Sequence, residues 1–241
     1  MPGLLYTILD RGEFSVILMD IIKDFFDLAG SLICHQLPER SLESGSIILP
    51  VCARDTGIYA GIFTAFMFLL LLRRMKAQKP PGIAATVVMC ILMLPMMLDG
   101  ALSYAGLIET NNAARIFTGL LFGLPIPFLL VPAANFRLDG RNEAPVLKKL
   151  IELLPVYCTG LLLCALLLYG MVPYIAAGLI FISGFLFLVS RLAYTVFARI
   201  GLSKKWKLYF MTFICTASIL VILYLLSAHV LHPLQDMLIR G

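Results

Sequence analysis

The sequence predicts an all-α membrane protein, a polytopic bundle of six transmembrane helices preceded by an amphipathic helix at the membrane interface. Composition is the first observation behind this prediction. The chain is 61% hydrophobic and 14% charged, with a mean hydropathy of +0.96, whereas about a quarter of the residues in a soluble protein are charged. The second observation is that the apolar residues form long continuous runs, which favour helices over the alternating pattern of a membrane β-barrel.

The first predicted element is an amphipathic helix over residues 14–33. Asp20, Lys23, Asp24 and Asp27 recur at helical spacing on one face, and mainly apolar side chains fill the remainder. These charges argue against a seventh span. We therefore expect this helix to lie in the outer membrane interface or to fold back onto the bundle.

Six apolar runs follow, each approaching the length of about 20 residues that crosses a bilayer core about 30 Å thick. They cover residues 56–72, 81–98, 116–134, 153–171, 172–190 and 208–230. Because no charge lies between Glu152 and Arg191, the fourth and fifth runs are expected to form one helical hairpin.

Two pairs of glycines indicate how the spans pack. Gly57 and Gly61 lie in the first run, and Gly119 and Gly123 lie in the third. Small residues spaced four apart allow helix backbones to approach closely in a membrane. We expect both pairs to be packing sites.

Basic residues predict the orientation. They concentrate in three alternate connections, after the first, third and fifth runs, which the positive-inside rule assigns to the cytoplasm. Residues 1–55 carry eight acidic and four basic residues. We therefore expect a protein of the cytoplasmic (inner) membrane with both termini outside. Residues 1–55 are expected to form an extracytoplasmic amphipathic helix and a loop that carries the Cys34-His35 motif, and residues 56–241 the six-span bundle. The net charge of +5 reflects this orientation and gives no support to nucleic-acid binding.

Groups capable of metal or anion chemistry gather immediately before the first span. The segment is characterised by the following residues in order: Cys34, His35, Pro38, Arg40, Ser41, Pro50, Cys52, Ala53, Arg54, Thr56, Gly57, Tyr59 and Gly61. These residues in this order resemble the motif of the membrane proteins grouped as domain of unknown function family 2085. Asp99, Gly100 and residues 112–119 resemble the later signature of that family. Many relatives carry a cysteine where this chain has Asp55. If the family site binds a metal, the resemblance therefore implies either that Asp55 supplies an oxygen ligand in its place or that the site has changed in this chain.

The two cysteines of this segment allow three interpretations. Cys34, His35, Cys52 and Asp55 could supply two sulfurs, one nitrogen and one oxygen to a tetrahedral zinc ion. A disulfide between Cys34 and Cys52 would instead pin the interfacial helix to the first span, which an extracytoplasmic location permits. Alternatively, both thiols are free and buried.

Charged residues at the ends of the spans form a second candidate group. Arg54, Asp99 and Arg115 are expected near one level of the bilayer, and ionisable groups at that depth are expected to pair with one another. An alternative is a pocket in which the arginines bind an anionic substrate, a lipid phosphate or a small anionic solute. His229 and His232 face the same compartment and could complete a metal site, or be ordinary interfacial residues.

Two functions from different classes therefore remain open. In the first, an extracytoplasmic site binds a metal ion and presents an anionic substrate to Arg54 or Arg115, with the metal activating water. In the second, the protein is a non-enzymatic transporter or membrane assembly factor, and Cys34 and Cys52 form a structural disulfide. Sequence signatures of serine hydrolases, nucleotide-binding loops and zinc peptidases are absent.

Overall fold

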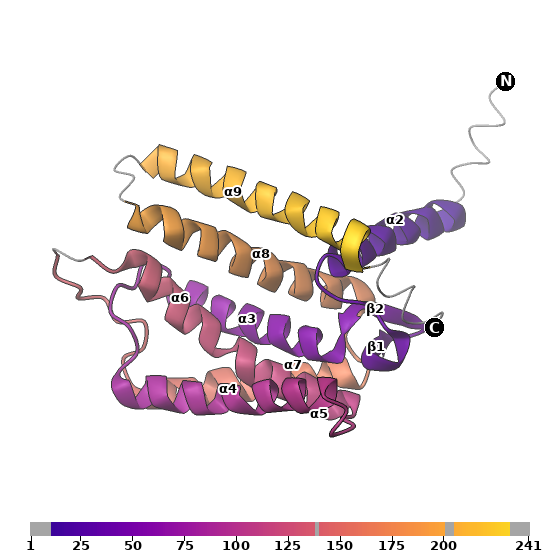
Figure 1. Cartoon of the computed structure of the whole chain (residues 1–241), viewed down its shortest axis with the longest axis horizontal. Coiled ribbons are helices and arrows are strands. Elements are labelled where there is room, and N and C mark those ends of the chain that lie inside the picture. Colours follow the sequence, from indigo (N-terminus) through magenta and orange to yellow (C-terminus); the bar gives the residue numbers. More distant parts are fainter. Residues whose placement is uncertain (1–10, 138–139, 201–204, 232–241) are drawn as a thin grey trace.

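The structure, a computed structural model, describes residues 11–137, 140–200 and 205–231 (Figure 1). Within these ranges, six helical segments are long and apolar enough to cross a membrane, which confirms the predicted bundle. They are Ala53–Leu71, Ile83–Ser103, Asn112–Asn135, Leu150–Leu168, Tyr174–Arg199 and Lys205–His229. No large sheet accompanies them in the described part of the chain.

The spans correspond to named helices with the following bounds: α3 (Ala53–Leu71), α4 (Ile83–Tyr104), α5 (Asn112–Gly123), α6 (Pro125–Asn135), α7 (Leu153–Leu168), α8 (Tyr174–Arg199) and α9 (Lys205–Leu226). A 3-10 turn, η2 (Leu150–Glu152), precedes α7, and a π turn, η3 (Ser227–Leu231), follows α9. The third span is divided into α5 and α6 because Pro125 has no backbone N–H to continue the helical hydrogen bonding, and it serves as the first residue of α6 instead.

Helix α3 lies at the centre of the bundle and contacts α5, α7 and α8, whereas α9 packs mainly against α8 at the edge (Figure 1). The glycine prediction is confirmed at the α3–α5 contact. A Cβ atom added at Gly57 would overlap the carbonyl oxygen of Ile116, and one added at Gly119 would overlap that of Arg54. The two backbones are therefore in direct contact, which fixes the start of α3 against the start of α5.

The segment before α3 folds onto one end of the bundle. Helix α2 (Arg11–Ser31) is followed by a 3-10 turn, η1 (Pro38–Arg40), and by an antiparallel hairpin of β1 (Ser41–Ser44) and β2 (Ile47–Cys52). The hairpin stands where the sequence predicts a loop. Val51 is almost fully buried, and Ser44 Oγ donates to Val172 O, so contacts with the bundle stabilise strands that are too short to be stable alone.

The C-terminal half of helix α2 packs against β2 and α8, whereas its first half projects beyond the end of the bundle (Figure 1). The predicted packing onto the bundle therefore applies to the C-terminal half only. Phe26 is 3% exposed, packs edge-on against Tyr174 and lies over Gly178 of α8. The charged face carries an ion pair between Lys23 and Asp27. The hydrogen bond and charge of Asp27 raise the pKa of Lys23.

Candidate functional site

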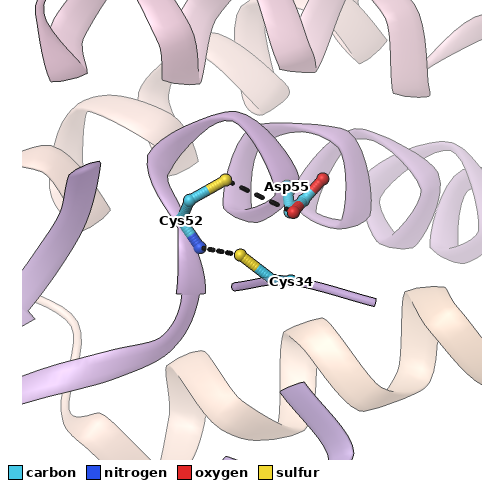
Figure 2. Close-up of side chains that lie close together, drawn as sticks. All are labelled: Cys34, Cys52 and Asp55. Atoms are coloured by element: carbon cyan, nitrogen blue, oxygen red, sulfur yellow. Dashed lines mark hydrogen bonds between the residues drawn. The ribbon is translucent and has the colours of Figure 1, made fainter. Parts of the chain in front are cut away.

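Cys34, Cys52 and Asp55 meet where β2 passes into α3. Figure 2 shows Cys52 at the start of the helix, with Asp55 in the first turn and Cys34 on a neighbouring segment. Cys52 Sγ donates to Asp55 Oδ2 over 3.3 Å, and the backbone N–H of Cys52 donates to Cys34 Sγ over 3.3 Å. The two sulfurs and a carboxylate oxygen all lie within 4.8 Å of one another.

The turn after α2 places Cys34 beside Cys52. Gln36 adopts a left-handed conformation with a φ of 52°. Its side-chain amide donates to Asp27 O over 2.8 Å and to Pro50 O over 2.9 Å. One residue thereby ties the end of α2 to β2, which brings Cys34 against the start of α3.

The two thiols differ electrostatically. The pKa of Cys34 lies below its ordinary value of 9.0, chiefly because the Cys52 side chain hydrogen bonds to its sulfur. The pKa of Cys52 is raised by the same hydrogen bond and by burial. Cys34 is therefore the more readily ionised of the two thiols, and the thiolate is the form that binds metal ions.

These residues line a cavity of about 200 Å³ at the hairpin end of the bundle. His35 and Gln36 share the wall with the three clustered residues, and Ser103 of α4 closes another side. Three arginines also line it: Arg40, Arg54 and Arg115. Asp55 is the one carboxylate among the lining residues, so the cavity carries a net positive charge.

Arg54 and Asp99 form an ion pair, one of the pairings that the sequence allowed among the charged residues at the span ends. Arg54 Nε and Nη2 lie 3.1 and 2.6 Å from Asp99 Oδ2. The Asp99 side chain is 7% exposed, and its Oδ1 atom has no hydrogen-bond partner among the described residues. Asp99 acts on the cavity through Arg54, because Asp99 is not itself one of the lining residues.

The remaining predicted residues have mixed outcomes. Arg115 lines the cavity as expected. His35 lines it too, but its side chain is exposed and lies outside the three-residue cluster. His229 is not among the lining residues, and its Nδ1 atom lies 3.0 Å from Leu225 O in the preceding turn. His232 lies outside the described residues. Cys34 and Cys52 are free thiols in the structure.

Sequence reasoning did not identify Arg40, Gln36 or Ser103 as cavity residues. Arg40 and Gln36 lie within six residues of Cys34 in the sequence, and this proximity could have indicated that they line the same cavity. Ser103 follows Asp99 by four residues on α4 and therefore shares its helix face. Nothing in the sequence distinguishes Ser103 from other polar residues at helix ends.

Comparison with known proteins matches residues 34–129 to the family described as predicted membrane protein (DUF2085). A stretch of 102 residues, 42% of this chain, is 33% identical to an uncharacterized protein of Methanocaldococcus jannaschii and covers 64% of that protein. A stretch of 98 residues, 40% of this chain, is 38% identical to an uncharacterized protein of Methanothermobacter thermautotrophicus and covers 83% of it. No solved structure matches the chain. Every cavity residue from Cys34 to Arg115 falls inside the family match.

Proposed function

The chain belongs to the DUF2085 family of predicted membrane proteins, and from that premise we propose that it binds a metal ion through Cys34, Cys52 and Asp55 and an anionic substrate or lipid phosphate beside it. One observation carries the proposal: three ligand atoms of the kinds that zinc prefers lie within 4.8 Å of one another, on the wall of an arginine-lined cavity.

The donor set fits zinc. Two cysteine sulfurs and one carboxylate oxygen supply three protein ligands, and catalytic zinc sites keep three protein ligands with the fourth position open to water or substrate. The pKa of Cys34 is lowered from its ordinary value by the hydrogen bond from the Cys52 side chain, which favours the thiolate as ligand. His35 is not needed as a ligand in this arrangement, although it lines the same cavity. When bound, the metal would act as a Lewis acid towards water or an anion in the cavity.

The proposed location is the extracytoplasmic face of the cytoplasmic membrane. The hairpin lies at the end of the bundle opposite the α3–α4 and α6–α7 connections, which contain Arg73, Arg74 and Arg141 (Figure 1). The cavity is at the hairpin end, because Cys52 at the end of β2 and Arg54 in the first turn of α3 line it. The positive-inside rule places those basic connections in the cytoplasm. On this basis the cavity opens towards the outer leaflet, where lipid phosphates and soluble anions are both accessible.

Metal analysis of detergent-purified protein, prepared without chelators or reductants, tests this proposal. We expect about one zinc ion per chain, which is lost in the Cys34→Ser, Cys52→Ser and Asp55→Asn variants. Cys90→Ser is the matched control, because Cys90 is an exposed cysteine of α4 away from the cavity. A metal-free wild-type protein, or full metal content in Cys34→Ser and Cys52→Ser, would contradict the proposal.

The second candidate is a non-enzymatic transporter or assembly factor with a structural disulfide between Cys34 and Cys52. It is favoured by the same proximity of the two sulfurs, which lie within 4.8 Å of one another. In this case purified protein would contain no metal and would show two fewer reactive thiols than its six cysteines. The Cys34→Ser and Cys52→Ser variants would then be destabilised equally.

A further inference from the structure

We propose that Arg40 and Arg115, which line one cavity and are positioned there by hydrogen bonds of Asn112, bind the phosphate group of an anionic ligand. This inference deepens the proposed function by naming the chemical class of its anion and the residues that bind it. It requires the cavity but not the metal, so the two proposals can fail separately.

Asn112 connects the two arginines. Its amide nitrogen donates to Glu39 O over 3.4 Å and to Ser41 O over 3.2 Å, the two carbonyl groups that flank Arg40 in the chain. Its Oδ1 atom accepts from Arg115 Nη1 over 3.3 Å. One side chain therefore fixes both the backbone that carries Arg40 and the guanidinium of Arg115, although these segments are more than 70 residues apart in the sequence.

Charge distinguishes this pair from the third arginine of the cavity. The charge of Arg54 is balanced by Asp99. Arg115 makes its side-chain hydrogen bonds to neutral groups, Thr110 Oγ1 and Asn112 Oδ1. Within the described part of the chain, neither Arg40 nor Arg115 lies within ion-pair distance of a carboxylate.

Two guanidinium groups that have no ion-pair partner among the described residues match a doubly charged phosphate. Arginine presents a planar fork of donors that binds phosphate oxygens in pairs. The first turn of α5, which begins at Asn112 after the cap Asn111, adds the positive end of the helix dipole on the side of Arg115. The cavity of about 200 Å³ has room for such an anion, since a water molecule occupies about 30 Å³ of the liquid. The phosphate could belong to a lipid headgroup or to a soluble solute.

The first arm of the test is calorimetric titration of inorganic phosphate into detergent-solubilised protein. We expect binding that weakens about tenfold or more in Arg40→Gln and in Arg115→Gln, because a hydrogen bond to a charged group is worth about 1.5 to 3 kcal/mol. Arg141→Gln is the control, as it removes one exposed positive charge outside the cavity. Asn112→Ala should weaken phosphate binding while both arginines remain, and Arg115→Lys should weaken it while the charge remains.

The second arm identifies the source of the phosphate. Native mass spectrometry compares phosphatidic acid with diacylglycerol of the same acyl chains, in wild type and in Arg115→Gln. Selective, arginine-dependent retention of phosphatidic acid supports a lipid phosphate, and arginine-dependent calorimetric binding of inorganic phosphate supports a soluble one. Binding of neither probe, or equal binding by wild type, Arg40→Gln and Arg115→Gln, would overturn the inference.

Metal analysis of the same samples separates the two proposals. Phosphate binding that persists in a metal-free Cys34→Ser protein supports the arginine site on its own. Conversely, a wild-type protein that contains metal but binds neither probe overturns this inference and leaves the metal site standing. Circular dichroism spectra and urea unfolding midpoints of Arg40→Gln and Arg115→Gln that match the wild type show that any loss of phosphate binding is not caused by unfolding, whether or not the protein contains metal.

Discussion

Replacing Asp99 by alanine is expected to destabilise the protein by about 3 to 5 kcal/mol, the cost of breaking a buried ion pair by removing one partner. The side chains of Arg54 and Asp99 are 13% and 7% exposed, and the shorter N–O distance is 2.6 Å. Two charges centred about 4 Å apart interact by about 4 kcal/mol at an effective dielectric constant of about 20. This electrostatic value agrees with the range measured for such pairs.

The assay is a double-mutant cycle of Asp99→Ala, Arg54→Ala and the combined variant. Unfolding by urea in mixed micelles is followed by far-ultraviolet circular dichroism, and the coupling is the part of the effect that is not additive. The double variant should be less destabilised than the sum of the single variants, because it leaves no unbalanced buried charge. A coupling of about 1 kcal/mol or less, typical of exposed pairs, would refute the reasoning and mean that water reaches both groups.

Two further variants test the packing and the electrostatics of the site. In the same unfolding assay, Gly119→Ala should lower the free energy of unfolding by about 1 to 3 kcal/mol, because its Cβ would overlap the backbone oxygen of Arg54. Gly100→Ala is the control: its Cβ has open space, so the free energy of unfolding should stay the same or rise by up to about 1 kcal/mol. Equal effects of the two variants would contradict the close α3–α5 contact. In metal-stripped protein, iodoacetamide should alkylate Cys34 with a midpoint below pH 9.0, since the pKa of this thiol is lowered by Cys52. Cys52→Ala should move that midpoint upwards and slow the reaction at neutral pH, which mass spectrometry follows as the yield of modified peptide. A midpoint that stays in place or moves downwards in Cys52→Ala would contradict the assignment.

The spans could be predicted from the sequence because continuous apolar runs of about 20 residues are typical of helices that cross a membrane. Their ends were less predictable, and α4 illustrates the reason. The predicted span stopped at residue 98, before the charged Asp99, yet the helix continues to Tyr104. Asp99 is accommodated by Arg54, which lies 45 residues away in the sequence. A hydropathy pattern contains no information about such a distant partner.

The composition of the site was predictable in part. Cys34, Cys52, Asp55, Arg54 and Arg115 all line one cavity, as their clustering near the span ends indicated. The adjacent His35 has a different environment, because consecutive side chains of a turn do not share a direction: Cys34 is buried and His35 is exposed.

The hairpin and the role of Asn112 were not predicted. Strands β1 and β2 span only four and six residues, and their stability comes from contacts with the bundle that follows. The hydrogen bonds from Asn112 to the carbonyl oxygens of Glu39 and Ser41 join segments far apart in the chain. Close packing of α3 on α5 makes this contact possible, because it fixes the start of α5 beside the segment that precedes α3.

The metal-binding and disulfide interpretations describe alternative states of the same two sulfur atoms. A disulfide leaves neither Cys34 nor Cys52 as a thiolate, so one chain cannot have both the disulfide and the proposed zinc site. Metal content and free-thiol count must therefore change together: a chain with metal retains both thiols, and a chain with the disulfide lacks metal. The Arg40 and Arg115 site does not share these atoms, so phosphate binding should be possible in either state. If phosphate binds equally well to oxidised and reduced protein while metal content differs, the anion site and the cysteine site are separable parts of one cavity.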